Sequence, residues 1–116
     1  MKLIHYTCAA AKVFDDEQAR GVTGRVLIGK LDGASHFCMR SFEIKPGGHT
    51  PRHAHAWEYE IFFHSGEAQV YINGELLSAG PGTALYVAPD EEHQIRNAGK
   101  ETLIVVCLIP AGAPEL

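Results

Sequence analysis

Short segments rich in β-branched and aromatic residues recur along the chain, separated by glycines and prolines. They lie at residues 25–28, 37–44, 59–63, 68–72, 84–87, 93–96 and 102–109, and most begin about ten residues after the one before. This spacing predicts an all-β sandwich or barrel, because βαβ units need long helical crossovers between their strands. Asn73-Gly74, which stands between two apolar segments, predicts a two-residue hairpin turn.

The stretch at residues 9–19 is the one candidate for a helix. It contains good helix formers, but Val13 and Phe14 do not extend into a long apolar stripe, so a short helix and a strand-like arm are equal alternatives. The length of 116 residues corresponds to one domain. We predict an N-terminal arm over residues 1–20, a β-barrel over residues 21–112 and a C-terminal tail over residues 113–116.

The charge balance argues against nucleic acid as a partner. Lys and Arg number 10 and Asp and Glu number 14, so the formal net charge is −4, and no cluster of basic residues is present. The longest apolar run, residues 103–110, is far shorter than the roughly 20 residues that span a bilayer. The N-terminus also lacks an apolar segment of signal-peptide length. We therefore expect a cytoplasmic protein that binds neither nucleic acid nor membranes.

Three of the seven histidines stand in a pattern that favours metal binding. His53 and His55 are two residues apart, so in an extended segment both imidazoles project from one face. Neutral imidazole is the commonest protein ligand for transition metals. His93 opens a later apolar segment after a turn, and a barrel can bring it opposite the first pair. The sequence therefore predicts a metal site built from His53, His55 and His93.

The two histidine segments resemble the two motifs of the cupin superfamily. In the first, five residues separate Gly47 from His53, His55 follows, and Gly66 closes the motif at the expected spacing. In the second, five residues separate Gly82 from a position that is usually proline, and His93 follows at the expected distance. Ala88 and Asp90 replace the usual proline and glycine of that second motif, and Asn97 ends it.

The resemblance covers most of residues 20–110 and is strongest to small single-domain cupins that bind manganese through four histidines. It implies a single jelly-roll barrel, a metal ion inside it and a homodimer. An excess of apolar surface around Trp57, Phe62 and Phe63 also fits a dimer interface, with core packing as the alternative.

The chain departs from the four-histidine pattern at one ligand position, which holds Tyr59. Tyr59 can coordinate as a phenolate, Glu60 can serve as the ligand in its place, or three histidines can hold the ion with Tyr59 beside them. Strand alternation puts Tyr59 with Ile61 and Phe63 and puts Glu60 on the other face, which favours three histidines. A metal-free barrel with three buried histidines is the remaining alternative.

Strand alternation also predicts the walls of a pocket. Ile95 shares a face with His93, and Val105 and Cys107 share a face of the last segment. Arg40 lies on the face of Phe42 and Ile44, which is unusual because arginine is seldom buried without a partner. We expect Arg40 to hold an anionic substrate near the metal; the alternative is an arginine at the barrel mouth paired with a surface glutamate.

Three imidazoles leave open positions on a divalent ion for substrate or dioxygen. We therefore expect one Mn, Fe, Ni, Cu or Zn ion per chain and a dioxygenase-type enzyme that acts on a small anionic or enolisable molecule. Tyr59 and Arg40 are the candidate catalytic residues. The alternatives are a non-catalytic metal- or sugar-binding barrel and a metal-dependent isomerase or lyase.

Overall fold

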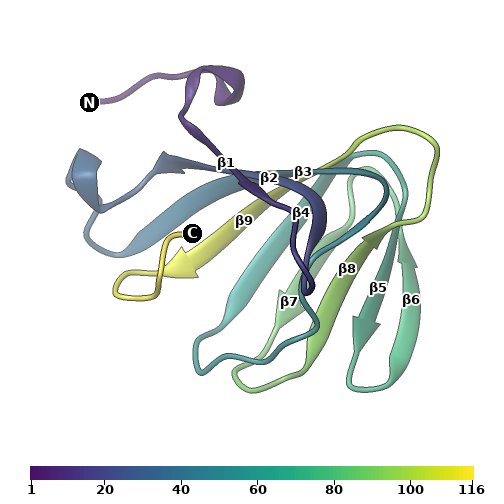
Figure 1. Cartoon of the computed structure of the whole chain (residues 1–116). Helices are drawn as coiled ribbons and strands as arrows, with labels where there is room; N and C mark the ends of the chain where they lie inside the picture. The colour runs from purple at the N-terminus through teal and green to yellow at the C-terminus, as the bar shows by residue number, and fades with distance from the viewer.

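Alternation of buried and exposed residues along the strands builds a curled antiparallel sheet, seen in Figure 1. The computed structural model describes residues 1–116. Two short 3₁₀ turns, η1 (Tyr6–Cys8) and η2 (Lys30–Asp32), accompany nine strands. The strands are β1 (Ala11–Phe14), β2 (Arg20–Ile28), β3 (Phe37–His49), β4 (Tyr59–Ser65), β5 (Ala68–Ile72), β6 (Glu75–Ala79), β7 (Ala84–Val87), β8 (His93–Asn97) and β9 (Leu103–Pro110).

The long strand β3 joins the two halves of the barrel. The strand order is β6-β5-β8-β3-β9-β4-β7, and β2 pairs with β3 and carries β1 at its outer edge. Residues 37–44 of β3 pair with β9, whereas His49, near the other end, pairs with Arg96 of β8. Because one strand belongs to both halves, the sheet curls into a jelly-roll barrel, the architecture that the resemblance to cupins implied.

The core lies between the two halves and contains the inward side chains of alternate residues. Phe63, Ile44 and Leu103 are completely buried, and a cluster of twelve buried residues draws on both halves of the barrel. The residues of β9 alternate strictly between buried and half-buried from Leu103 to Pro110. This period of two is the one expected for a strand with one face on the core.

Two backbone features fix the motif segments in place. Gly66 has a φ of +89°, and a Cβ there would lie 2.9 Å from the Thr102 carbonyl oxygen, so only glycine fits. Asp90 has a φ of +66°, the left-handed conformation that aspartate tolerates better than most residues. This conformation explains why glycine is the usual residue at the position that Asp90 holds.

The local predictions agree with the structure at most positions. Each predicted segment contains or overlaps a strand, and the Asn73-Gly74 turn has positive φ at both residues, as a type I′ turn requires. Of the two alternatives for residues 9–19, the strand is the correct one: β1 pairs with β2. The three cysteines form no disulfide. The structure contains no helix that could span a membrane.

Candidate metal centre

Backbone pairing brings two distant histidines into contact. The His53 N–H donates to the His93 carbonyl at 3.1 Å, and the His93 N–H donates to the His53 carbonyl at 2.9 Å. Residues that exchange both hydrogen bonds in an antiparallel pair project their side chains from the same face. The Asp90 N–H donates to the His55 carbonyl at 2.8 Å, which ties the second histidine to the same turn.

The imidazoles of His53, His55 and His93 converge on one space. One ring nitrogen from each can be chosen so that all three lie within 4.8 Å of one another. The ring centroids of His53 and His93 are 4.8 Å apart, and those of His55 and His93 are 4.9 Å apart. A modest approach of these nitrogens toward one another would let one ion bind all three, since Zn–N bonds are about 2.0–2.1 Å long.

Hydrogen bonds at Nδ1 orient two of the rings for coordination. The Nδ1 of His55 lies 2.9 Å from the Trp57 carbonyl oxygen, and the Nδ1 of His93 lies 2.9 Å from the Glu91 carbonyl oxygen. A carbonyl only accepts, so each Nδ1 carries the proton and each Nε2 keeps its lone pair. The Nε2 of His93 is buried and has no partner in the protein. A buried lone pair of this kind fits a metal ligand.

Burial favours the neutral form of two of the three rings. Burial lowers the pKa of His93 below its usual value. Burial, followed by the neighbouring His93 and His55, lowers the pKa of His53 to about 4, although His53 is the most exposed of the three. Imidazole binds metals in its neutral form, so the lowered pKa values of His53 and His93 favour metal binding at neutral pH.

Tyr59 lies beside the histidines. Its ring centroid is 5.4 Å from that of His55 and 5.6 Å from that of His93. Its hydroxyl donates to the Cys107 sulfur at 3.4 Å. Burial raises the pKa of Tyr59 well above its usual value, so the side chain is a neutral phenol.

Glu60 lies on the opposite, exposed face of β4, and the structure does not bring it to the histidines. The cause is the two-residue period of the strand: Tyr59, Ile61 and Phe63 point inward, and Glu60 and Phe62 point outward. A carboxylate from Glu60 would have to cross the sheet to reach the histidine group.

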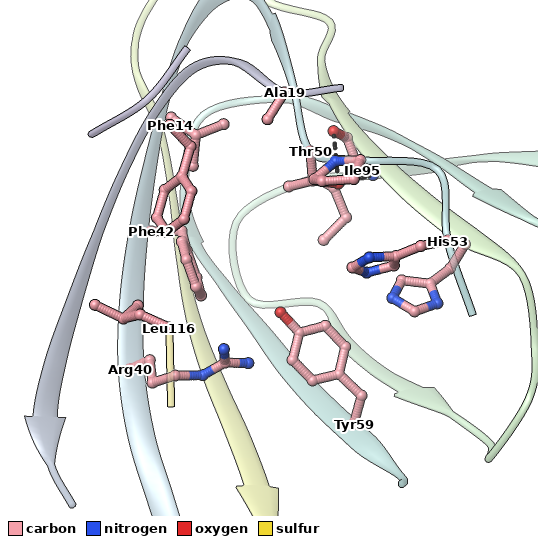
Figure 2. A pocket seen from close by; sticks show the side chains of 12 residues that line it. Phe14, Ala19, Arg40, Phe42, Thr50, His53, Tyr59, Ile95 and Leu116 are labelled. Carbon is pink, nitrogen blue, oxygen red and sulfur yellow. Dashed lines mark hydrogen bonds between the residues drawn. The ribbon is translucent and has the colours of Figure 1, made fainter. Parts of the chain in front are cut away.

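A cavity of about 160 Å³ opens beside the histidines (Figure 2). Of the three predicted wall residues, only Ile95 lines it; Val105 and Cys107 are buried in the core instead. Val105 and Cys107 do share one face of β9, as predicted. Tyr59, which lines the cavity, contacts the Cys107 sulfur with its hydroxyl. The lining residues are Phe14, Ala19, Val22, Arg40, Phe42, Thr50, Pro51, His53, Tyr59, His93, Ile95 and Leu116.

Three wall residues come from outside the predicted barrel. Phe14 of β1, Ala19 just before β2 and Leu116 of the C-terminal segment all line the cavity. Leu116 also lines an adjoining cavity of about 330 Å³, together with His55 and Trp57. Neither Phe14 nor Leu116 lies in a motif, so neither is predicted as a wall residue from the sequence. The one available signal was that Phe14 is an aromatic residue in the short N-terminal arm.

Arg40 is buried, with 8% of its surface exposed, and lines both cavities. Its guanidinium carbon lies 5.0 Å from the Phe42 ring centroid and 5.2 Å from the Tyr59 ring centroid. The ion pairs of the chain are Lys2–Asp32 and Arg25–Glu43, so no carboxylate pairs with Arg40. The alternative of a partner glutamate at the barrel mouth is therefore wrong.

Comparisons with known proteins agree with this architecture. The cupin domain family matches residues 40–109. The polyketide cyclase RemF from Streptomyces resistomycificus is 32% identical, with 98% of this chain and 82% of that chain covered and a TM-score of 0.89. A predicted oxalate decarboxylase from Thermotoga maritima is 19% identical, with 95% and 99% covered and a TM-score of 0.83, a likeness of fold. No curated protein matches the sequence.

Proposed function

Because the chain belongs to the cupin domain family, we propose that it is a metal-dependent enzyme acting on a small enolisable carbonyl compound. His53, His55 and His93 would hold one divalent transition-metal ion. The observation that carries this proposal is the convergence of three imidazole nitrogens, one of them the buried and unpartnered Nε2 of His93. Such an ion supplies Lewis acidity, which favours loss of a proton next to a carbonyl group.

We place the reaction among cyclisations and related isomerase or lyase reactions. Support comes from the 32% identity to a polyketide cyclase over 98% of this chain. Ring closure of a polyketide requires an enolate carbon and needs no oxidant. A dioxygenase reaction would begin with the same loss of a proton but would consume oxygen. Oxygen uptake therefore distinguishes the two reactions.

Tyr59 is suited to stabilise the oxygen on which negative charge develops. Its neutral hydroxyl lines the cavity next to the histidines, where it can donate a hydrogen bond. Cys107 supports this role: burial raises the pKa of the thiol to about 11, so the sulfur keeps its proton. The hydroxyl hydrogen can rotate to a substrate while the Cys107 S–H donates to the phenol oxygen. Phe14, Phe42 and Ile95 line the same cavity with apolar surface that disfavours water.

Tyr59→Phe is expected to slow enolisation while leaving the metal in place. The probe is phenylpyruvate, an enolisable 2-oxo acid, whose C3 hydrogens exchange for deuterium in D₂O and are followed by NMR. The protein should accelerate this exchange, and the variant should lose roughly 100- to 1,000-fold of that rate, as expected for loss of one hydrogen-bond donor to the developing oxyanion. Metal content per chain should stay unchanged. Tyr59→His, which restores a four-histidine pattern, should bind the metal more tightly.

Tyr86→Phe is the matched control, because Tyr86 is exposed on β7 and does not line the cavity. It should leave the exchange rate unchanged. Release of the metal by Tyr59→Phe would make Tyr59 a direct ligand and contradict this assignment. Oxygen uptake in proportion to substrate, measured with an electrode, would show a dioxygenase and reject the cyclase-type reaction.

We also propose that a second copy of the chain covers the outer face of β4, β7 and β9. Phe62 and Tyr86 are about half exposed there, at 48% and 54%. A groove of about 370 Å³ on this face is lined by one charged residue and eight apolar ones: Met39, Glu60, Ile61, Phe62, Ala84, Leu85, Tyr86, Val106 and Leu108. Two such faces related by a two-fold axis would bury apolar surface with little unpaired charge.

Phe62→Asp is expected to convert the dimer into monomers, because it places a charge in the centre of this apolar face. Light scattering should give a mass near twice 12.6 kDa for the parent and near 12.6 kDa for the variant. Leu76→Asp is the control: Leu76 is 60% exposed on β6, at the other end of the strand order. A parent that is monomeric at high micromolar concentration would reject the proposal.

A further inference from the structure

The guanidinium of Arg40 is an unpaired buried cation at the edge of the candidate site. Its only hydrogen bond runs from Nη1 to the Glu115 carbonyl oxygen, at 3.2 Å. Its Nε is buried and has no partner. Figure 2 shows the guanidinium and the Tyr59 hydroxyl directed toward the same space. A charged group taken out of water without a counter-charge is costly, so this arrangement favours an anion.

Arg25, a partly buried arginine on the neighbouring strand β2, provides a comparison. Arg25 of β2 pairs with the Glu43 carboxylate, and this ion pair neutralises it within the protein. Arg40 is also buried, but no carboxylate pairs with it. A ligand in the cavity that Arg40 lines can supply the missing counter-charge.

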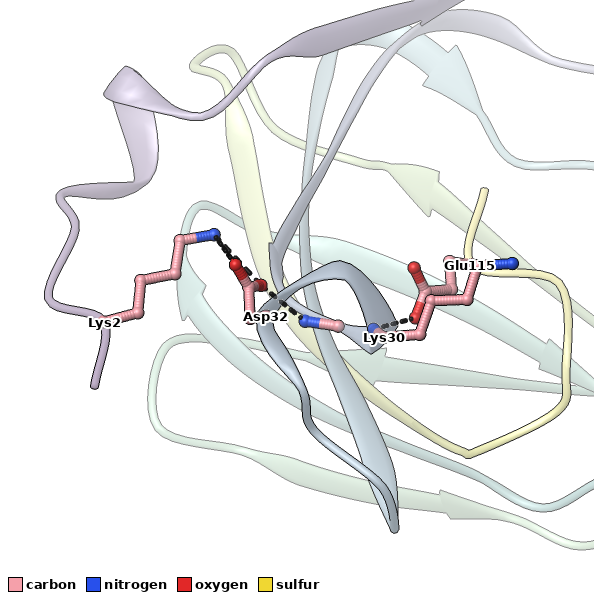
Figure 3. Close-up of polar contacts among 5 residues, drawn as sticks. Lys2, Lys30, Asp32 and Glu115 are labelled. Carbon is pink, nitrogen blue, oxygen red and sulfur yellow. Dashed lines mark hydrogen bonds and ion pairs between the residues drawn. The ribbon is translucent and has the colours of Figure 1, made fainter.

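The Glu115 carbonyl holds one side of the guanidinium and leaves another side free. The Glu115 carboxylate is turned away toward η2, where it accepts a hydrogen bond from the Lys30 N–H at 2.9 Å (Figure 3). Only the Glu115 carbonyl therefore faces Arg40, on Nη1. The edge formed by Nε and Nη2 makes no hydrogen bond to the protein. Two parallel N–H groups on one edge match the two oxygens of a carboxylate.

We propose that Arg40 is the anchor for a carboxylate on the substrate, bound by the Nε and Nη2 edge, so that the site selects organic acids over neutral ketones. This inference deepens the proposed function and rests on it for the identity of the reacting end. The apolar rings of Phe14 and Phe42 line the same cavity and accommodate an aromatic or alkyl body. Glu115 is a positioning residue, because its carbonyl holds Nη1 and thereby fixes which edge is free.

Benzoate and benzamide test this role by calorimetric titration, since they have nearly the same shape and differ in charge. The protein is used as purified, and its metal content is measured in every sample. Benzoate should bind at least about tenfold more tightly than benzamide, as expected for charge-assisted bidentate hydrogen bonds. Arg40→Gln should abolish this preference, and Arg40→Lys should retain part of it. Arg96→Gln, which removes an exposed arginine of β8, should leave the preference intact.

Three results would overturn the proposal: equal binding of benzoate and benzamide, a preference that survives in Arg40→Gln, or a preference lost equally in Arg96→Gln. The His53→Ala variant separates the anchor from the metal. A preference that persists in His53→Ala and disappears in Arg40→Gln supports Arg40, even if no metal is found and the proposed function fails. A preference that disappears in His53→Ala and persists in Arg40→Gln places the carboxylate on the metal and rejects Arg40 as the anchor.

Discussion

Replacing His53 and His55 together with alanine is expected to remove nearly all bound metal from the protein. Two of the three converging imidazoles are lost, and His93 alone offers a single nitrogen. Changes beside a metal ligand already lower affinity about 10- to 100-fold, so removal of two ligands should exceed that range. The measurement is elemental analysis of protein purified without an affinity tag, which also identifies the metal among Mn, Fe, Ni, Cu and Zn.

The barrel itself should survive this change. His53 is exposed and His55 is half-buried, and the backbone hydrogen bonds of His53 with His93 do not need the side chains. His64→Ala is the matched control, because His64 is exposed on the outer face of β4, away from the group. It should keep one metal per chain. Full metal stoichiometry in the double variant would refute the site.

Phe63→Ala is expected to destabilise the fold by about 3–5 kcal/mol, the range measured when a buried aromatic side chain is removed. Phe63 is completely buried in the core cluster. Its neighbour Phe62 is 48% exposed on the other face of β4, so Phe62→Ala should cost less than about 1 kcal/mol. Urea unfolding followed by circular dichroism compares the two variants, at a protein concentration low enough to keep association out of the comparison.

This pair of variants also tests which way the neighbouring residues of β4 point. Tyr59 is on the face of Phe63, and Glu60 is on the face of Phe62. Equal losses of stability in the two variants would contradict the assignment of faces. They would also remove the reason for placing Tyr59 beside the histidines and Glu60 outside.

The sequence by itself determined the features that depend on neighbouring residues. The two-residue period placed His53 and His55 together and separated Tyr59 from Glu60, because successive side chains of an extended chain point to opposite faces. Asn73-Gly74 determined its turn because few residue pairs adopt positive φ at both positions. The match to two motifs then supplied the pairing of His93 with the first two histidines, which the spacing of residues alone does not give.

The tertiary structure decided everything that depends on contacts between distant segments. Residues 9–19 carry no decisive local preference, and β1 is a strand because β2 offers its edge. The partner of Arg40 is a carbonyl 75 residues away, and the cavity is walled by Phe14 and Leu116 from the two ends of the chain. Val105 and Cys107 were assigned to the correct face, yet that face has both core and cavity positions. Alternation fixes only the direction of a side chain; which space that direction meets depends on how the sheet curls and on what else fills the barrel.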